Sequence, residues 1–409
     1  MAAGGPSGAA FDVAVVGAGA AGMMCAAVAG QRGRRVVLID HASRLAEKIR
    51  ISGGGRCNFT NRDAGPANFI SDNPHFCRSA LSRYTPRDFL ALVARHRIAW
   101  HEKHRGQLFC DESSEDIIRM LRAECDAGGV RWRMGCPVSE VARDGQGFEL
   151  RTAQGAIRAS RLVVATGGMA IPQLGATDFG LKIARQFGLK VVEPRPALVP
   201  LTFDPAQWQP LAALAGVALE VGLRTGQGKA RGEFLEDLLF THRGLSGPAI
   251  LQISSYWKPG EPIVVDLAPG RDLAAELLAL KSGNRQQLHT VLAGLWPRRL
   301  ADAWLHLAER AGRPGLAALR MADAPDKTLR ALAQDIHQWS LVPSGTAGYK
   351  KAEVMRGGVD TRGLDQKTMQ AKALPGLYFV GEAVDVTGWL GGYNFQWAWA
   401  SGVACGRAL

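Results

Sequence analysis

Phe11–Asp40 reads FDVAVVGAGAAGMMCAAVAGQRGRRVVLID, and this stretch decides the fold. Phe11–Val16 is an apolar run with β-branched residues, which is typical of a buried parallel strand. Gly17, Gly19 and Gly22 follow with the spacing G-x-G-x-x-G. The first glycine allows a tight turn, the second lets backbone approach a pyrophosphate, and the third lets the next helix pack closely on the strand. A second short apolar strand completes the unit, so the stretch predicts a Rossmann-type α/β domain.

Asp40 ends that second strand, where an acid hydrogen-bonds a ribose 2′-hydroxyl in dinucleotide-binding domains. The helix that opens after Gly19 directs N–H groups and the positive end of its dipole toward phosphates. Because the strand ends in an acid rather than an arginine, FAD or NAD is favoured over NADP as the bound ligand. The alternative is a glycine-rich turn that holds no ligand.

The composition is that of a globular protein with an excess of basic residues. The chain has 409 residues, 47% of them hydrophobic and 21% charged, which is enough for two or three domains. Its formal net charge is +12. Residues 32–105 contain 15 Lys and Arg against 6 Asp and Glu, together with five of the nine histidines. This basic segment favours a polyanionic partner such as RNA, with a generally Arg-rich composition as the alternative.

The cysteines give no sign of a metal site or a disulfide framework. There are seven, an odd number, and none forms a C-x-x-C pair. We expect no metal and a reducing, cytoplasmic location. Residues 1–10 lack the basic region of a signal peptide, and the apolar run that ends near Ala29 is interrupted by glycines, so we expect neither a targeting segment nor a membrane span.

Three later stretches look placed to complete the ligand site. Lys48 lies on a predicted short helix, and the turn Ser52–Gly55 after it should bring Arg56, Asn58, Thr60 and Asn61 beside the ligand. A buried strand over residues 161–168 ends in Ala-Thr-Gly-Gly. Near the C-terminus, a strand at 377–380 is followed by Gly381-Glu382, and a glycine-rich segment then opens the last helix. A helix start that faces a flavin's pyrimidine ring would stabilise negative charge on the reduced ring.

The middle of the chain reads as an insertion. Three prolines within 194–200 predict a boundary, because prolines seldom lie inside a regular element. Residues 201–224 alternate like strands, and 240–248 read as a loop in which Ser246 caps a helix that starts at Pro248. We therefore expect a discontinuous FAD-binding domain at 11–195 and 351–409, an inserted β-rich domain at 196–270 and 331–350, and a helical insertion at 271–330.

Five motifs make the chain similar to a known family. They are G-A-G-A-A-G at 17–22, K-I-R-I-S-G-G-G-R-C-N-F-T-N at 48–61, F-T-H-R-G-L-S-G-P-A at 240–249, G-G-V at 357–359 and G-E-A-V-D-V-T-G-W-L-G-G-Y-N-F-Q at 381–396. With them the chain resembles the BaiN/RdsA family of FAD-dependent oxidoreductases, also called YhiN-like flavoproteins, from about Phe11 to Gly406. Residues 106–111, G-Q-L-F-C-D, depart from the G-R-x-F-P-type segment expected there and resemble the branch that reduces uridine in ribosomal RNA.

The resemblance implies a tightly held FAD that is reduced by NADH or NADPH. It also implies FAD contacts from Gly17, Gly19, Gly22, Asp40, Lys48, Arg56, Gly381, Glu382 and Asn394. We extend the predicted cofactor-binding set to the neighbours Ala20, Ala21, Gly54, Gly55, Cys57, Asn58, Thr166, Gly167, Asp385, Gly392, Tyr393 and Phe395.

The resemblance further implies reduction of an electron-poor C=C bond, either in a bile-acid-type enone or at C5=C6 of uracil. Flavin N5 delivers hydride β to a carbonyl, and an acid protonates the α carbon. Cys57, Cys110, His242 and Tyr393 are the candidate acids, and packing or structural hydrogen bonding is the alternative role for each. An aromatic side chain would stack on the splayed base, with Trp100, Phe109, Trp389 and Tyr393 as candidates.

Three functions remain open from the sequence. The first is a uridine reductase that acts on ribosomal RNA. The second is a small-molecule enone reductase or amine oxidase, and the third is a flavoprotein that binds RNA or a partner without catalysis. The chain has no second G-x-G-x-x-G for a nicotinamide, so NAD(P)H should bind transiently in the substrate's cleft, in ping-pong order.

Overall fold

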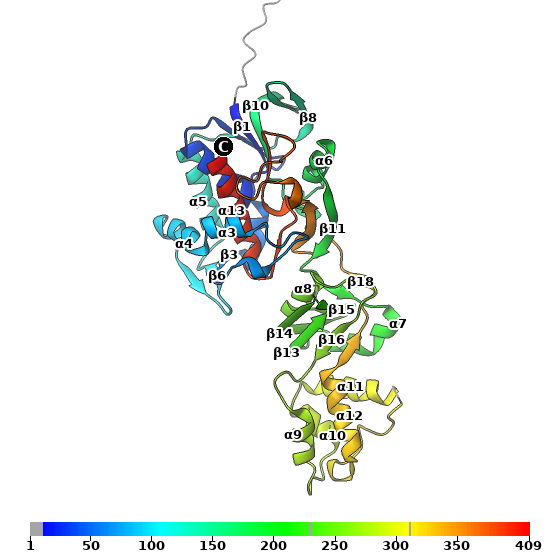
Figure 1. The fold of residues 1–409 in the computed structure, drawn as a ribbon. Coiled ribbons are helices and arrows are strands. Elements are labelled where there is room, and N and C mark those ends of the chain that lie inside the picture. The colour runs from blue at the N-terminus through cyan, green and yellow to red at the C-terminus, as the bar shows by residue number, and fades with distance from the viewer. Residues whose placement is uncertain (1–10, 229–230, 311) are drawn as a thin grey trace, which may run out of the picture. The chain divides into compact units, whose positions relative to one another are not determined.

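The computed structural model describes residues 11–228, 231–310 and 312–409 (Figure 1). Packing divides the chain into two compact units. Unit 1 contains the described residues up to Arg195 together with Val354–Leu409, and unit 2 is Pro196–Glu353. Each unit is described by itself.

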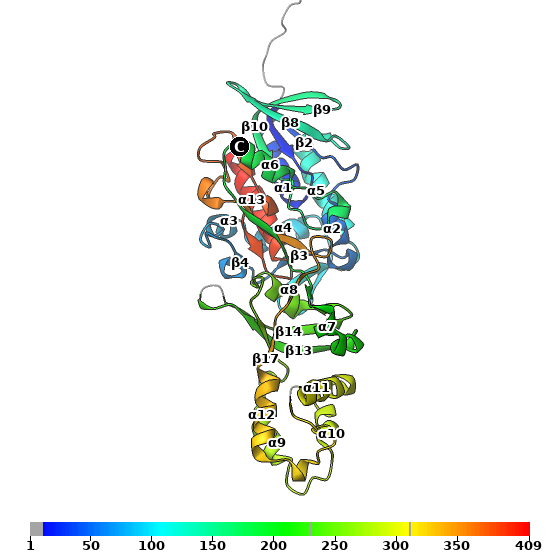
Figure 2. The same ribbon diagram turned by 90° about the vertical axis from the view of Figure 1, so that its right-hand side faces the viewer.

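A mostly parallel sheet forms the centre of unit 1, in the order β7-β2-β1-β10-β9-β8, with β20 paired to β10. Strands β7, β2, β1, β10 and β20 run parallel, whereas β8, β9 and β10 form an antiparallel meander, visible in Figure 2. The central strands are buried because their apolar runs lie between layers of helix. The bounds are β1 Phe11–Val16, β2 Val36–Ile39, β7 Arg131–Arg133, β8 Val138–Asp144, β9 Gly147–Thr152, β10 Gly155–Val164 and β20 Leu377–Phe379.

Helices α1 (Ala20–Gln31) and α13 (Tyr393–Ala408) pack against each other and are almost wholly buried. Their close approach requires glycine. A Cβ on Gly402 would lie 2.6 Å from the Ala21 carbonyl oxygen, and one on Gly406 would lie 2.8 Å from that of Cys25. The other helices of unit 1 are α2 Glu47–Ile51, α3 Arg78–Arg83, α4 Pro86–Arg95, α5 Glu115–Ala127 and α6 Phe179–Gln186.

Three small sheets complete unit 1. They are β3 (Asn58–Asn61) with β6 (Gln107–Cys110) and β5 (Trp100–Glu102), β4 (Phe69–Ile70) with β21 (Thr387–Gly388), and β11 (Val191–Ala197) with β19 (Val354–Val359). The expectation that prolines interrupt regular structure near residue 194 is wrong, because Pro194 and Pro196 lie within β11. A strand of a two-stranded sheet has a free edge, where a missing N–H costs little.

Unit 2 contains a second sheet, in the order β17-β16-β13-β14-β15-β12-β18. Its bounds are β12 Leu201–Thr202, β13 Ala218–Thr225, β14 Gly232–Thr241, β15 Gly244–Ser246, β16 Ile263–Asp266, β17 Trp339–Leu341 and β18 Gly345–Thr346. The helices are α7 Pro205–Trp208, α8 Pro248–Ser254, α9 Leu273–Ala279, α10 Leu288–Ala293, α11 Arg298–Arg310 and α12 Asp326–His337.

Two local expectations for unit 2 are corrected. Residues 205–214 are helical turns rather than strand, because Asp204 accepts hydrogen bonds from the backbone N–H groups of Ala206 and Gln207 and so starts α7. Ser246 belongs to β15, and Gly247 is the N-cap of α8 with φ 87°. Helix α12 continues past residue 330, and the division of the insertion into a β-rich and a helical domain stays a prediction.

Candidate functional site

The three glycines of the turn between β1 and α1 have different surroundings: two are packed against backbone and one borders open space. A Cβ on Gly17 would lie 2.3 Å from the Ala165 oxygen, and one on Gly22 would lie 1.8 Å from the Gly17 oxygen. A Cβ on Gly19 would meet no described atom within 4 Å. Gly17 and Gly22 are thus required by the protein itself, whereas Gly19 borders open space. Ala20 and Ala21 begin α1, whose N-terminus has no side-chain cap among the described residues, so its N–H groups suit a pyrophosphate.

Asp40 is fixed beside this turn. Its carboxylate accepts hydrogen bonds from the backbone N–H of Ala18 at 2.7 Å and of Ala42 at 2.8 Å. These two bonds leave further lone pairs on the carboxylate for a ribose hydroxyl. The Cys136 N–H donates to the Asp40 carbonyl oxygen at 2.8 Å, so residues after β7 also border this corner. The sequence analysis did not predict this contact, because the pairing of β7 with β2 cannot be read from the sequence.

Gly167 and Gly168, which follow Thr166 after the end of β10, lie next to Glu382. The Thr166 hydroxyl is buried without a hydrogen-bond partner in the described structure, and it faces α6, because a Cβ on Gly180 would lie 2.4 Å from its oxygen. Gly168 approaches Glu382 so closely that a Cβ would lie 2.6 Å from its carboxylate. Glu382 also accepts from the Met355 N–H at 2.8 Å and pairs with the Lys48 ammonium at 3.0 Å. Four segments of unit 1 therefore meet at one carboxylate.

The turn Ser52–Gly55 is tight, and Gly53 and Gly54 adopt left-handed backbone angles in it. Gly53 has φ 57°, and a Cβ there would lie 2.8 Å from both the Asn58 nitrogen and the Phe109 ring. Gly54 and Gly55 border open space, and Arg56 is exposed. The turn thus keeps its backbone accessible to a ligand on one side and packs on Phe109 on the other.

The β3 segment and the start of α13 are interlocked by buried hydrogen bonds. The Thr60 hydroxyl donates to the Gln396 amide oxygen at 2.7 Å, and the Asn61 amide donates to the Gly391 carbonyl oxygen at 3.1 Å. A Cβ on Gly392 would lie 2.4 Å from Thr60 backbone. The expectation that Thr60 and Asn61 face the ligand is therefore corrected: their side chains join two glycine-rich segments, and Gln396 is a scaffold residue that sequence reasoning missed.

Two predicted cofactor ligands are engaged elsewhere. The Asn394 side chain accepts from the Gly388 N–H at 2.8 Å and donates to the Gly388 oxygen at 2.9 Å, so it fixes its own loop. Asp385 is buried and accepts from the Asp72 N–H at 2.9 Å and from the Ser71 hydroxyl at 3.3 Å. Burial raises the pKa of Asp385, which these hydrogen bonds oppose. Both side chains position the frame of the site. The Asn58 side chain likewise faces Gln107, at 3.3 Å.

The four candidate proton donors occupy different surroundings. Cys57 and Cys110 are both 0% exposed, and burial raises the pKa of Cys57 strongly and that of Cys110 to about 12. Neither thiol is therefore accessible to a substrate. Tyr393, 9% exposed, is the first residue of α13, with ring centroids 6.3 Å from Phe69 and 6.2 Å from Trp389. His242 is exposed on the β14–β15 turn of unit 2 and stays a prediction.

The residues present fit a dinucleotide. Unit 1 offers an open glycine turn, a fixed acid at Asp40 and an α1 N-terminus without a side-chain cap among the described residues. The N-terminus of α13, at Gly392, also has no side-chain cap within the described ranges. Phe395 stacks on Trp399, with centroids 5.7 Å apart, and supports this helix start from within the core. No group of three or more His, Cys, Asp or Glu in the described part of the chain could hold a metal ion.

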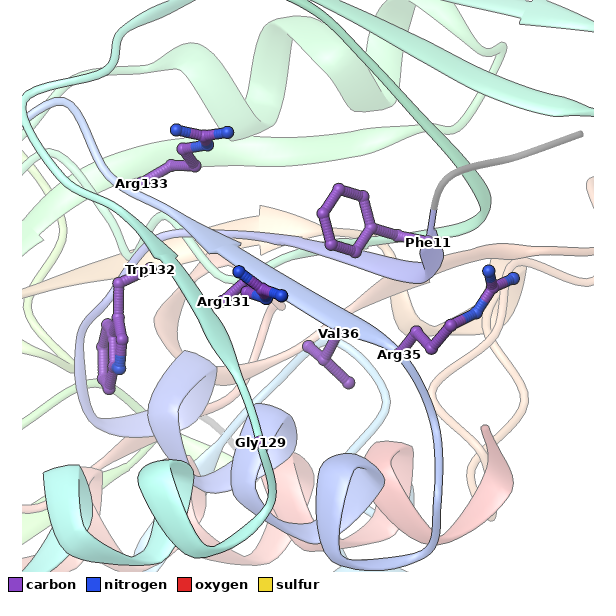
Figure 3. A pocket seen from close by; sticks show the side chains of 7 residues that line it. All are labelled: Phe11, Arg35, Val36, Gly129, Arg131, Trp132 and Arg133. Atoms are coloured by element: carbon purple, nitrogen blue, oxygen red, sulfur yellow. The ribbon is translucent and has the colours of Figure 1, made fainter. Parts of the chain in front are cut away.

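A pocket of about 410 Å³ lies away from these residues, beside the start of β1 and along the β2–β7 edge of the sheet (Figure 3). Its lining consists of Phe11, Arg35, Val36, Gly129, Arg131, Trp132 and Arg133. None of the predicted site residues contributes to it. Within the described residues, no helix is both long and apolar enough to cross a membrane.

Residues 11–408 match the family described as HI0933-like protein Rossmann domain. The chain belongs to this family. It is 49% identical over 400 residues to the ribosomal RNA dihydrouridine synthase of Escherichia coli K12, with 98% of each chain covered. It is 28% identical over 411 residues to the 3-dehydro-bile acid delta(4,6)-reductase of Clostridium scindens, covering 97% of this chain and 98% of that one. Membership confirms the family resemblance and the enzyme class, an oxidoreductase.

The fold also extends to a more distant solved structure. A chain of the Mycobacterium smegmatis Sdh1 complex in the apo form superimposes with a TM-score of 0.50 at 16% identity, covering 97% of this chain and 67% of that one. At this identity the likeness concerns the fold alone. The predicted α/β, Rossmann-type class is confirmed.

Proposed function

We propose that the chain is an FAD-dependent enzyme that takes electrons from NADH or NADPH and reduces the C5=C6 bond of uridine to dihydrouridine in 23S ribosomal RNA. The observation that carries the proposal is the end-to-end similarity, at 49% identity, to a ribosomal RNA dihydrouridine synthase. The site in unit 1 supports it, because its glycine turn, its fixed acid and the open N-terminus of α1 suit FAD.

In this proposal Gly19 and the α1 N-terminus bind the pyrophosphate, Asp40 binds the adenosine ribose, and the backbone at Thr166 and Gly167 borders the same ligand. When bound, FAD supplies the hydride that adds to the uracil ring. The uncapped N-terminus of α13 favours negative charge beside it, which lowers the energy of charge that develops during reduction. The Lys48–Glu382 pair holds the segments around β10, β19 and α2 in place.

We assign the proton donor to Tyr393. Both cysteines are shielded from substrate, whereas Tyr393 opens α13 among aromatic rings that can also stack on a base. A phenol is a weak acid at neutral pH, which suits delivery of one proton to the uracil carbon as hydride arrives. Tyr393→Phe should lower turnover by about 100-fold or more, since general acid catalysis contributes about 10²–10⁴-fold, and should leave flavin content unchanged.

The basic segment 32–105 supplies the electrostatic attraction to ribosomal RNA, and a cytoplasmic location accords with that substrate. A second candidate function is reduction of a small enone. The specific observation in its favour is the similarity, over 97% of this chain, to a bile-acid reductase. Both functions use the same hydride and proton transfer, so the substrate alone distinguishes them.

The test is to incubate the holoenzyme and NADPH with ribosomal RNA purified from a host strain that lacks the gene, and to analyse its nucleosides by mass spectrometry. Appearance of dihydrouridine, absent without enzyme or NADPH, is expected. Unchanged RNA together with NADPH consumption on a steroid enone would favour the second function. Steady-state kinetics with NADH and NADPH should show ping-pong order, because one cleft serves both substrates.

A further inference from the structure

The β5–β6 hairpin is attached directly to the frame of the candidate site. Strand β6 pairs with β3, with Thr60 opposite Leu108. The Asn61 amide donates to the Arg105 carbonyl oxygen at 2.9 Å as well as to that of Gly391. A Cβ on Gly391 would lie 2.9 Å from the Gln107 amide nitrogen. One buried side chain therefore connects the tip of the hairpin to the start of α13. Figure 1 shows the hairpin in cyan, with its strand β6 labelled.

The outer surface of this hairpin combines an exposed indole with cations. Trp100 is 40% exposed, and the other large hydrophobic side chains exposed in the described structure are aliphatic. Arg97, Lys103 and Arg105 are exposed on the same segment. The Lys103 ammonium lies 5.4 Å from the Phe109 ring centroid, on the face of the hairpin where His101 stacks on Phe109, and Trp100 alternates to the other face of β5. Proteins that bind single-stranded nucleic acid combine aromatic side chains, on which bases stack, with cations that contact the backbone, and this hairpin carries both.

The acids near the hairpin do not cancel this charge. Glu102 pairs with Arg62, and Asp111 pairs with His101 at 2.7 Å. Elsewhere in the basic segment some cations are paired with acids, as in Arg35 with Asp12 and Arg95 with Glu124. The other ion-paired cations of the segment are Arg44, Lys48 and Arg50. Lys103 and Arg97 have no carboxylate partner in the described structure, so the hairpin carries part of the unpaired positive charge of the segment. The rest lies on Arg32, Arg34, Arg56, Arg78, Arg83 and Arg87, which have no carboxylate partner among the described residues either.

We propose that residues 97–107, the Trp100 hairpin, bind an unpaired segment of RNA next to the active site. Trp100 stacks on a base that flanks the target, and Lys103 and Arg105 contact the adjoining phosphates. The inference rests on the proposed function and names the element that holds its substrate. An unpaired strand is the occupant that fits, because a stacking surface needs a base whose face is free, whereas a duplex conceals its bases.

The test measures binding of the oxidised holoenzyme to a fluorescein-labelled single-stranded RNA by anisotropy at several salt concentrations. Trp100→Ala should weaken binding about ten-fold, within the range that one stacked base contributes, and Trp100→Phe should restore most of it. Lys103→Ala combined with Arg105→Ala should reduce the slope of log K against log salt by about 1.4, because each phosphate that a cation neutralises adds about 0.7 to that slope. The matched control is Arg131→Ala with Arg133→Ala, which removes two exposed arginines from β7 (Figure 3) and should leave binding unchanged.

Flavin content and the unfolding temperature confirm that each variant is folded. Unchanged binding by Trp100→Ala, an equally weakened β7 control, or equally tight and Trp100-dependent binding of duplex RNA would each overturn the inference. Binding is measured without NAD(P)H and so does not depend on turnover. If RNA binding depends on Trp100 but uridine is not reduced, the proposed function is refuted and the role of the hairpin is not. If uridine is reduced but RNA binding does not depend on Trp100, the role of the hairpin is refuted and the proposed function is not.

Discussion

Substituting alanine for Gly19 tests whether the glycine turn holds a pyrophosphate. Gly19 has φ −89° and ψ −166°, which alanine accepts, and its added Cβ would meet no protein atom within 4 Å. Alanine at an N-cap costs about 0.5–1 kcal/mol relative to glycine. Alanine also lowers the conformational entropy of the unfolded chain, which stabilises the folded protein by about 0.4–1 kcal/mol. The free energy of unfolding of the apoprotein should therefore change by less than about 1 kcal/mol.

Affinity for FAD should change far more. The methyl group occupies the space into which a phosphate must come to accept hydrogen bonds from the α1 N-terminus. Removal of one or two charge-assisted hydrogen bonds, each about 1.5–3 kcal/mol, weakens FAD binding about 100-fold or more. Titration of apoprotein with FAD, followed by flavin fluorescence, measures the dissociation constant. Thermal unfolding of the apoprotein measures its stability.

Two further glycines serve as controls. Gly145→Ala adds the same methyl group in open space on the β8–β9 turn and should change neither quantity. Gly22→Ala places a Cβ 1.8 Å from the Gly17 oxygen and should destabilise the apoprotein itself. If Gly19→Ala bound FAD within about threefold of the wild type, the pyrophosphate would not lie at this turn. If it destabilised the apoprotein as Gly22→Ala does, the space beside Gly19 would not be open.

The remaining predictions concern stability and reactivity. Thr60→Val leaves the buried Gln396 oxygen without its donor and should lower the free energy of unfolding by about 1–3 kcal/mol in urea titrations; an unchanged value would mean that the bond is not formed. Arg362 lowers the pKa of Asp360 in the folded protein through their hydrogen bond. The stability that this carboxylate contributes is therefore complete above the pKa of Asp360 in the unfolded chain, and it is lost as the pH falls through the lower pKa of the folded protein. The difference in unfolding free energy between the wild type and Asp360→Asn should therefore shrink in acid, and a constant difference would contradict the pairing. All seven cysteines are buried and free, so a thiol reagent should react slowly with the native protein. After denaturation the reagent should modify seven thiols. Rapid modification of the native protein would show that a thiol is accessible.

Local sequence rules account for the core of unit 1. The apolar run of β1, the glycine spacing and the capping pattern of α4 act over a few residues, so steric and hydrogen-bonding preferences fix them without reference to the rest of the chain. The same rules wrongly predicted that Pro194 interrupts regular structure and that Ser246 caps α8. A strand tolerates a proline where one of its edges is unpaired, and pairing depends on distant segments of the chain. Which residue caps a helix depends on where the backbone turns into it, which here is Gly247 and not Ser246.

The sequence by itself determined that Phe11–Asp40 forms a strand, glycine turn, helix and strand that can bind a dinucleotide. Only the tertiary structure decided that Gly19 alone among the three glycines borders open space, because the neighbours of Gly17 and Gly22 are backbone atoms placed by the fold. It also decided that Thr60 meets Gln396, 336 residues away, and so serves the frame of the site. A side chain's type limits what it can bond, and packing between distant segments selects the partner it does bond.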